Sequence, residues 1–354
     1  MEARAAILLP DGELVVDVID LPDPAPGEVL VRNLATGVCH SQLHQIRSGY
    51  PRERAVLLGH EAASEVLAVG EGVTHVVPGD RVLLTWHRRD AKPGDGIPPG
   101  TSATWHGEPI GDEYDGIYTW SDHALARQEY VVHAPAEIDP ALTCIIGCAV
   151  MTGSGAVLNT ADVPGGASVA VIGAGGVGLS AIAAAAARGA DPVIAVDLDE
   201  SKLEFARRFG ATVGVNGSTG DAVEQVRELT GGGVDFAFDC IGHSATTRQA
   251  LLMARPGDWT ITTGGTAVLV GWPVADAAID ALDVVVGEKQ LLGSAGGSCR
   301  PERDFPVFYD WHRTGVLDLD ALITERWSLD EIGTAVERLA SGKVFGRSVV
   351  VFDQ

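Results

Sequence analysis

The stretch that most constrains the fold of this chain runs from Ser168 to Asp197. It begins with an apolar run, Val169–Ile172, that has the length and the β-branched content of a buried strand. The sequence GAGGVG follows at once at 173–178, and an alanine-rich helical segment leads from it to a second apolar run, Val193–Val196. This order predicts a βαβ unit that binds a dinucleotide: a strand, a glycine turn, a helix, a second strand and a terminal acid.

The glycines of this motif have separate predicted roles. Gly173 permits the tight turn, Gly175 lets the backbone approach a pyrophosphate, and Gly178 lets the helix pack closely on the strand. Gly176 completes the motif at the helix N-terminus, which offers N–H donors and a partial positive charge to the anion. The carboxylate of Asp197 is expected to accept hydrogen bonds from the adenosine ribose and to repel a 2′-phosphate. The motif therefore predicts NAD rather than NADP; a purely structural glycine turn is the alternative.

The rest of the chain predicts two domains and an α/β fold. From about 168 to 295, short apolar runs alternate with helical segments, which is typical of a doubly wound parallel sheet covered on both faces. Residues 1 to about 85 are rich in short apolar runs split by Pro and Gly, and 87–122 form a long polar segment, called the excursion below. We assign 150–295 to a Rossmann-type NAD-binding domain, and 1–149 with 296–354 to a β-rich catalytic domain. Leu142–Leu158 is expected to form one helix that carries Cys144 and Cys148.

The composition excludes several classes of partner. Acidic residues number 48 and basic ones 25, and the formal net charge of −23 argues against nucleic acid and against anionic membranes. The apolar run at 181–187 is too short to span a bilayer. An odd set of five cysteines fits a reduced protein, and no charged-then-apolar leader opens the sequence, so we expect a cytoplasmic location. Because the overall charge opposes an anionic cofactor, the helix N-terminus after Gly178 must carry much of the pyrophosphate's charge.

Three residues are candidate metal ligands: Cys39, His60 and Cys148. Cysteine sulfur and histidine nitrogen are the ligands that zinc prefers. Taken singly, each is unremarkable, because a buried cysteine is commonly a small hydrophobic residue. Their spacing alone does not join them into one site.

A family resemblance joins them. The matching stretches are GVCHSQLH (37–44), GHEAASEVLAVGEGV (59–73), GCAVMTG (147–153), GAGGVG (173–178), VDLDESKLEFARRFGAT (196–212), GGGVDFAFDCIG (231–242) and SGKVFGRSVVVF (341–352). With these motifs the chain resembles the zinc-dependent alcohol dehydrogenases of the medium-chain dehydrogenase/reductase superfamily over essentially its whole length. The resemblance implies a GroES-like catalytic domain and a catalytic zinc bound by Cys39, His60 and Cys148, with Glu61 beside it. It implies no structural zinc, because residues 85–130 contain no cysteine.

The resemblance also implies roles for residues around both sites. Ser41 would pass the substrate proton to the cofactor ribose and on to His44, although His44 could be an ordinary exposed histidine. Five residues are expected to contact the cofactor: His40 and Arg347 at the pyrophosphate, Lys202 at the ribose, and Val177 and Thr152 at the nicotinamide. For each of them, surface charge or packing is the alternative.

The sequence says less about the substrate and about the residue that supports the zinc-binding histidine. Trp86 aligns with an aromatic residue of the substrate channel in relatives, and Tyr50 and Trp120 are expected nearby. Aromatic walls suit benzylic, allylic or medium-chain alcohols, although each ring could equally pack the excursion. Relatives carry an acid where this chain has Gln42, which implies weaker support for the zinc-binding histidine.

The sequence therefore predicts an NAD-dependent, zinc-dependent alcohol dehydrogenase that interconverts an alcohol and its aldehyde or ketone by hydride transfer. The alternatives are a zinc-free quinone or enone reductase of the same superfamily and a non-enzymatic NAD-binding protein. The resemblance implies a homodimer joined through the sheet edges of the cofactor domain, with a tetramer as the alternative.

Overall fold

The computed structural model describes residues 1–47, 53–92, 94–112, 114, 116–258 and 262–353. Contacts within the chain divide it into two compact units. Unit 1 comprises Met1–Cys148, Arg300–Tyr309 and Leu319–Gln354, and unit 2 comprises Ala149–Cys299 and Asp310–Asp318. Residues 149, 296–299 and 310–318, assigned from the sequence to the catalytic domain, group with unit 2.

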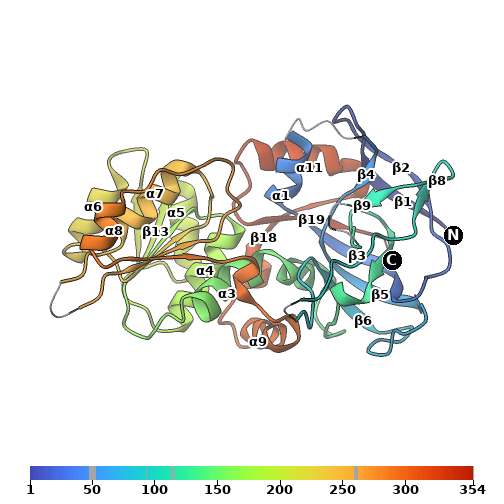
Figure 1. Ribbon diagram of the computed structural model, residues 1–354, viewed down its shortest axis with the longest axis horizontal. Helices are drawn as coiled ribbons and strands as arrows, with labels where there is room; N and C mark the ends of the chain where they lie inside the picture. Colours follow the sequence, from blue (N-terminus) through green and yellow to red (C-terminus); the bar gives the residue numbers. More distant parts are fainter. Residues whose placement is uncertain (48–52, 93, 113, 115, 259–261, 354) are drawn as a thin grey trace. The chain divides into compact units, whose positions relative to one another are not determined.

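Unit 1 consists mainly of β-strands with a few short helices (Figure 1). Its elements are β1 (Glu2–Leu8), β2 (Leu14–Asp20), β3 (Glu28–Val38), α1 (His40–Arg47), β4 (Val56–Leu57), β5 (Glu61–Val69), β6 (Arg81–Thr85), β7 (Thr104–Trp105), β8 (Glu108–Pro109), β9 (Gly111–Asp112), β10 (His123–Arg127), β11 (Val131–His133), α2 (Pro140–Thr143), a 3-10 turn at Cys144–Gly147, the start of α9 (Pro301–Arg313), α10 (Leu319–Leu322), β18 (Ile323–Trp327), α11 (Ile332–Ala340) and β19 (Arg347–Val351).

The strands of unit 1 form two sheets around an apolar core. A seven-stranded sheet has the order β11-β6-β5-β3-β19-β18, with β10 also paired to β3, and a six-stranded sheet has the order β8-β7-β2-β1-β4-β9. The C-terminal strand β19 pairs antiparallel with β3, so the last part of the chain completes the first sheet. Ile7, Val31, Val66 and Leu84 are fully or almost fully buried in this core, and β3 is buried along nearly its whole length.

Unit 2 is an α/β unit, and its elements follow one another in alternation. They are α3 (Ala149–Gly155) with a π-helical turn at Ala156–Thr160, β12 (Val169–Ile172), α4 (Gly176–Ala187), β13 (Val193–Asp197), α5 (Glu200–Ala206), β14 (Val213–Asn216), α6 (Ala222–Thr230), β15 (Phe236–Asp239), α7 (Ser244–Met253), β16 (Thr266–Leu269), α8 (Ala281–Val286) and β17 (Gln290–Gly293).

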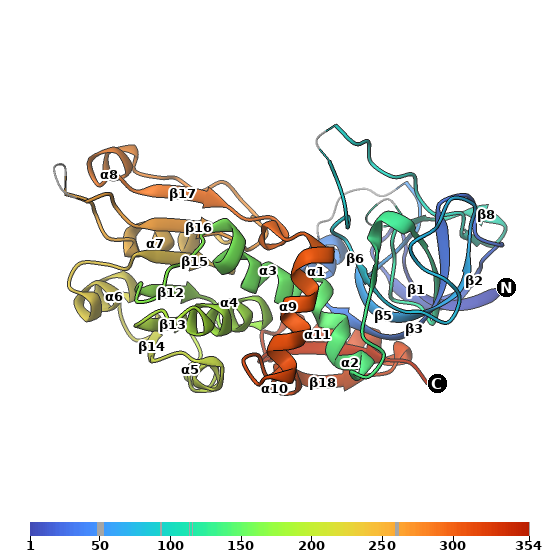
Figure 2. The same cartoon turned by 90° about the horizontal axis from the view of Figure 1, so that it is seen from below.

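The sheet of unit 2 is fully parallel with the order β14-β13-β12-β15-β16-β17 (Figure 2). The order reverses beside β12, which is the doubly wound Rossmann arrangement. Helices α4 and α5 pack on β12–β14, whereas α7 packs on β12, β15 and β16 and contacts α6. Strand β12 is buried along its whole length because helices cover both faces. The predicted α/β fold class, a Rossmann unit with a β-rich GroES-like unit, is confirmed.

Aspartates begin several helices of unit 2. The side chains of Asp199, Asp221 and Asp280 accept hydrogen bonds from backbone N–H groups two residues ahead, at 2.8–2.9 Å, and so cap α5, α6 and α8. Such caps satisfy N–H groups that have no partner inside a helix and favour the N-terminal dipole.

The predicted single helix over Leu142–Leu158 is wrong. The segment is broken at Cys148, whose backbone angles (φ −141°, ψ −74°) are not helical, between the 3-10 turn and α3. Cys144 and Cys148 therefore do not share a helical face. Cys144 is buried, and its thiol donates to the carbonyl oxygen of Ala141 at 3.1 Å, which is a packing role.

Two carboxylates order the excursion, one on strand β3 and one within the excursion itself. Glu28 is buried and accepts hydrogen bonds from the backbone N–H and the hydroxyl of Ser102, at 2.9 and 2.7 Å. Asp112 accepts from the backbone N–H groups of Thr101 and Gly116, at 3.0 and 2.6 Å. Hydrogen bonds to ionised acceptors are about twice as strong as neutral ones, so these two acids order a segment with little regular structure.

Among the described residues, no single helix is long and apolar enough to cross a bilayer. The helical segments Pro140–Gly147 and Ala149–Thr160 meet the criteria of length and composition only when they are taken together.

Candidate metal centre and dinucleotide site

Four ligand-type side chains of unit 1 meet at one point. One ligand atom each from Cys39, His60, Glu61 and Cys148 lies within 4.8 Å of all the others, and no other such group of three or more is found among the described residues. The Sγ atoms of Cys39 and Cys148 are 3.7 Å apart, and His60 Nε2 lies 3.3 Å from Cys148 Sγ. Both cysteines are free thiols. We call Cys39, His60 and Cys148 the metal centre.

Adjacent strands bring these residues together. Cys39 directly follows β3 and His60 directly precedes β5, and these strands pair with Thr36 opposite Ala62. Cys148 is positioned through β6, where the Thr85 hydroxyl donates to the carbonyl oxygen of Gly147 at 2.7 Å. The ends of three neighbouring strands thus define the centre, which the sequence spacing could not show.

The geometry of the donor atoms fits zinc. Tetrahedral coordination with Zn–S bonds of about 2.3 Å and Zn–N bonds of about 2.0–2.1 Å places two sulfurs about 3.8 Å apart and sulfur and nitrogen about 3.6 Å apart. The observed separations are 3.7 and 3.3 Å. Two cysteines and one histidine are a catalytic zinc set, which leaves a fourth position open.

Gln42 supports the metal centre from helix α1. Its side chain is almost completely buried; Oε1 accepts a hydrogen bond from the backbone N–H of Cys39 at 3.1 Å, and Nε2 contacts Nδ1 of His60. The second ring nitrogen of His60 therefore has an amide partner, where the family resemblance implied an acid.

Glu61 and Arg347 form a buried ion pair beside the metal centre. The Arg347 guanidinium donates to Glu61 Oε1, although the two residues lie 286 positions apart in the sequence. Arg347 is only 4% exposed, whereas the resemblance placed it at the cofactor pyrophosphate. Gly37 permits this approach, since a Cβ atom there would lie 2.3 Å from Glu61 Oε1. The other carboxylate oxygen, Oε2, is buried and has no hydrogen-bond partner among the described residues.

Burial and charge shift the ionisation of this cluster. The hydrogen bond from the Cys148 thiol holds the pKa of Cys39 well below its usual range, against the effect of burial. The same bond, together with burial, holds the pKa of Cys148 well above its usual range. Burial raises the pKa of Glu61 to about 7 against the opposing charge of Arg347. Burial acts to lower the pKa of Arg347, but Glu61 and the cysteines outweigh it, and the pKa is raised.

Full ionisation of this cluster requires positive charge beyond that of Arg347. Metal binding requires both thiols as thiolates. Two thiolates and the Glu61 carboxylate would then face Arg347 as the single cationic side chain of the cluster. One divalent cation balances this charge, so the donor set and its electrostatics agree on the kind of ion that fits.

Helix α1 presents the predicted proton-relay residues. Ser41 Oγ is buried and has no hydrogen-bond partner among the described residues, and His44 is half-buried three residues later, which is one turn along the same face. His40 begins the helix and is exposed. The relay and the pyrophosphate contact remain predictions.

The glycine turn of unit 2 has the geometry expected for its motif. Gly173 has φ +96°, a left-handed conformation that favours glycine. A Cβ atom on Gly178 would lie 1.7 Å from the carbonyl oxygen of Gly173, so only glycine allows α4 to pack this closely on the turn. A Cβ on Gly175 would meet no atom within 4 Å, which leaves open space where a pyrophosphate would approach.

Asp197 braces this turn at the end of β13. Its Oδ2 accepts from the backbone N–H of Ala174 at 2.8 Å, and its Oδ1 accepts from those of Leu198 and Asp199 at 2.7 and 3.2 Å. A carboxylate has about four acceptor positions, so capacity for a ribose hydroxyl remains. Lys202 is half-buried on α5.

Thr152 and Val177 lie on two helices of unit 2 that pack closely together. Thr152 is on α3 and Val177 is in the first turn of α4. The contact is tight because a Cβ on Gly153 would lie 2.0 Å from the carbonyl oxygen of Val177. Both side chains are half-buried, and their contact with nicotinamide remains a prediction.

The aromatic candidates differ in their surroundings. Trp86 is half-buried, and its ring lies 6.3 Å from that of Tyr114, which in turn meets the His60 ring edge-on at 4.9 Å. Trp120 is 1% exposed, and its indole N–H donates to the carbonyl oxygen of Gly37 at 3.0 Å, which is the environment of a packing residue. Tyr50 lies outside the described residues. No motif in the sequence marks Tyr114, because only the folded excursion brings it to His60.

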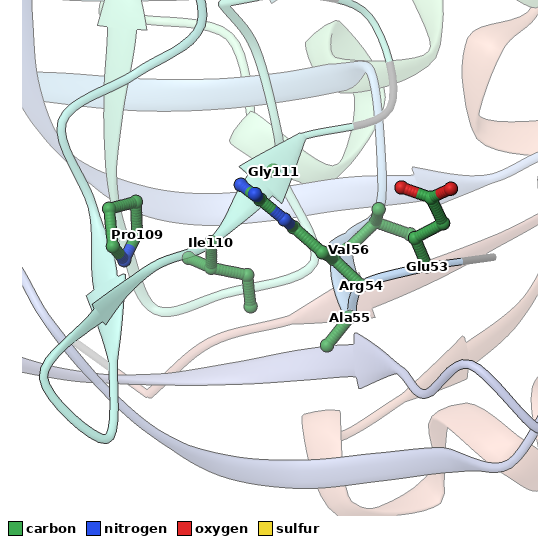
Figure 3. Close-up of a pocket in the computed structure, with 7 residues that line it drawn as sticks. All are labelled: Glu53, Arg54, Ala55, Val56, Pro109, Ile110 and Gly111. Atoms are coloured by element: carbon green, nitrogen blue, oxygen red, sulfur yellow. The ribbon is translucent and has the colours of Figure 1, made fainter.

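A surface pocket lies elsewhere in unit 1. It has a volume of about 460 Å³ and is lined by residues 53–56 on the β4 side and 109–111 on the β8–β9 side (Figure 3). None of its lining residues belongs to the metal centre.

Comparisons with known proteins agree with this description. Residues 25–136 match the alcohol dehydrogenase GroES-like domain, and residues 176–312 match the zinc-binding dehydrogenase family. The chain is 36% identical to an alcohol dehydrogenase class-3 of Cereibacter sphaeroides, with 99% of this chain and 100% of the relative covered. It is 34% identical to an S-(hydroxymethyl)glutathione dehydrogenase of Paracoccus denitrificans over the same shares.

A solved structure extends the likeness to three dimensions. The benzyl alcohol dehydrogenase of Acinetobacter calcoaceticus superimposes with a TM-score of 0.89 at 28% identity, over 100% of both chains. Full-length matches, the two domain models and the metal centre all point to the same group of enzymes. The chain therefore belongs to the zinc-binding alcohol dehydrogenases of the medium-chain dehydrogenase/reductase superfamily, and it is an oxidoreductase that acts on CH–OH groups.

Proposed function

We propose that this alcohol dehydrogenase uses NAD and one catalytic zinc ion, held by Cys39, His60 and Cys148, to interconvert an alcohol and its aldehyde or ketone. The observation that carries the proposal is the donor set, whose separations of 3.7 and 3.3 Å match tetrahedral zinc. Bound zinc would supply Lewis-acid polarisation of the substrate hydroxyl, and bound NAD would accept the hydride.

The chain's own residues would bind the reactants and move the proton. Ser41 Oγ, buried and without a partner among the described residues, would accept the proton of the substrate hydroxyl and pass its own toward His44. Glu61 and Arg347 would hold compensating charge behind the metal centre. The roles of His40, Lys202, Val177 and Thr152 at the cofactor are part of the same proposal.

The choice of NAD rests on Asp197. Its carboxylate ends β13, immediately beside the glycine turn, and is fixed there by its hydrogen bond from Ala174. A 2′-phosphate at this position would meet a like charge with no basic residue in the β13–α5 turn, Leu198–Glu200, to neutralise it.

We also propose planar, largely apolar alcohols, such as benzylic or allylic ones, as substrates. The half-buried rings of Trp86 and Tyr114 next to His60 support this class. The relative from Paracoccus denitrificans is named for a glutathione adduct, which carries net negative charge. A formal charge of −23 on this chain works against such an anion.

The alternative of a zinc-free reductase would leave the metal centre without a purpose. Its two thiols, with a buried carboxylate beside them, would have only Arg347 to balance three negative charges in their ionised form. The non-enzymatic alternative is disfavoured by the unpartnered Ser41 hydroxyl, which a purely structural site would not retain.

We propose a cytoplasmic homodimer. All five cysteines are free, as in a reducing compartment. Strand β17 is the edge of its sheet, and next to it the side chains of Leu282 and Val285 on α8 are 69% and 74% exposed. Apolar sheet edges are normally covered, and an edge strand can pair antiparallel with its own copy about a twofold axis. Sedimentation equilibrium distinguishes a dimer from a tetramer.

A pair of cysteine variants tests the metal assignment. Cys148→Ala should lose zinc and lower alcohol oxidation by about 10²- to 10³-fold, the scale of removing one group that stabilises the transition state, while NADH affinity stays near that of wild type. Cys144→Ala is the matched control, because it removes a buried thiol four residues away that lies outside the metal centre. Zinc per chain, NADH fluorescence titration and benzyl alcohol oxidation are measured on all three proteins. Wild-type turnover in Cys148→Ala would refute the assignment.

A further inference from the structure

We propose that Gln42 is a positioning residue whose side-chain amide has one orientation in the metal-free centre and the opposite one when zinc is bound. The inference rests on the zinc site proposed above. It adds that the amide at position 42 makes zinc binding less favourable.

The hydrogen-bond partners determine the amide orientation. Gln42 is almost completely buried on α1, and Oε1 accepts from the backbone N–H of Cys39 at 3.1 Å. A backbone N–H can only donate, so the amide oxygen must face Cys39. The amide NH₂ is then the group that faces Nδ1 of His60, as the structure has it.

This orientation determines the tautomer of His60. Because the amide donates to Nδ1, the ring proton belongs on Nε2, where it donates to Cys148 Sγ at 3.3 Å. That is a self-consistent metal-free arrangement. A metal, however, needs the lone pair of Nε2, so zinc binding moves the ring proton to Nδ1.

The zinc-bound tautomer conflicts with the amide. Nδ1–H would then face the NH₂ of Gln42, which places two donors against each other. Rotation of the amide by a half turn brings its oxygen to Nδ1–H, but it turns the NH₂ toward the Cys39 N–H. In either orientation the amide oxygen lies at only one of these two positions, whereas a carboxylate has an oxygen at each. Zinc binding therefore costs one hydrogen bond here.

The first test compares two glutamate variants of helix α1. Gln42→Glu supplies the second acceptor, and Gln45→Glu adds the same charge three residues away, at a half-buried position of the same helix. Zinc affinity is measured on metal-stripped protein by competition with a chromophoric chelator. We expect Gln42→Glu to bind zinc about 10- to 100-fold more tightly than wild type, the usual size of such outer-shell effects. Gln45→Glu should stay within about fivefold, the scale of a surface charge.

The second test needs no substitution at Gln42. Histidine side-chain ¹⁵N–¹H correlation spectra, with the His60 signal identified by its loss in His60→Gln, report which ring nitrogen carries the proton. We expect Nε2–H in the metal-free wild type and Nδ1–H after zinc is added. An Nδ1 proton already present without metal, or equal zinc affinity of the two glutamate variants, would overturn the inference. Neither result touches the proposed function, which fails instead if wild type binds no zinc.

Discussion

Two alanine substitutions in the glycine turn should separate folding stability from cofactor affinity. Gly175 has φ −90° and ψ −172°, which alanine adopts freely, and a Cβ there would meet no atom within 4 Å. Alanine is a slightly poorer cap for α4 than glycine. We therefore expect Gly175→Ala to change the free energy of unfolding by less than about 1 kcal/mol.

Gly178→Ala should behave in the opposite way. Its Cβ would lie 1.7 Å from the carbonyl oxygen of Gly173, whereas Cβ contacts under 3.0 Å essentially never occur. Either α4 or the turn must move by about 1.3 Å, the difference between these distances. Overpacking of this kind costs about 1–3 kcal/mol of stability, and occasionally more.

The expected loss of cofactor affinity is large for Gly175→Ala. Its methyl group would occupy the space where pyrophosphate oxygens approach the backbone. Loss of one hydrogen bond to a charged group costs about 1.5–3 kcal/mol, which weakens NADH binding about 10- to 150-fold.

Urea unfolding followed by circular dichroism and NADH fluorescence titration measure the two quantities on the same preparations. Wild-type NADH affinity in Gly175→Ala would refute the predicted backbone approach to the pyrophosphate. A stability loss above about 3 kcal/mol in that variant would show that the space around Gly175 is not open.

Three further outcomes follow from the site. Asp197→Asn removes the charge but keeps an oxygen for the Ala174 N–H, so the preference for NAD over NADP should fall by about tenfold or more; an unchanged ratio of kcat/KM values would contradict the ribose role. The pKa of Glu61 in the folded metal-free protein is raised from 4.5 to about 7, so the native state binds a proton that the unfolded state has released. The contribution of Glu61 to stability is thus greatest below pH 4.5 and decreases up to about pH 7. The difference in the free energy of unfolding between wild type and Glu61→Gln, measured with urea, should therefore decrease over that pH window. A difference that is constant with pH would argue against the shift. Tyr114→Leu should lower kcat/KM for benzyl alcohol relative to hexan-1-ol by about 2- to 12-fold, the worth of one aromatic pair, and a constant ratio would mean that Tyr114 only packs.

The local sequence pattern was sufficient to predict the dinucleotide-binding unit but not to predict the metal centre. The strand–glycine–helix–strand order depends on near neighbours, so the parallel sheet and the three glycine positions could be predicted from spacing. Cys39, His60 and Cys148 are joined by strand pairing over more than a hundred residues, and only the family resemblance connected them in advance.

The remaining differences have the same tertiary origin. The helical pattern continues through Cys148, whereas the folded chain breaks there so that the thiol can reach the metal centre. Arg347 and Glu61 are paired by the closure of β19 onto β3, which no sequence window contains. Tyr114 reaches His60 because the Tyr130 hydroxyl donates to its carbonyl oxygen and Asp112 accepts from the backbone N–H of Gly116, two residues beyond it.

The way the excursion is held has a consequence for experiments on this enzyme. Because Glu28 and Asp112 bind backbone N–H groups directly, its cohesion depends on neither a metal ion nor a redox-active side chain. A chelator should therefore leave this segment in place and act at the metal centre. Loss of activity under such treatment can then be interpreted as chemistry at one site, without a simultaneous collapse of the surrounding scaffold.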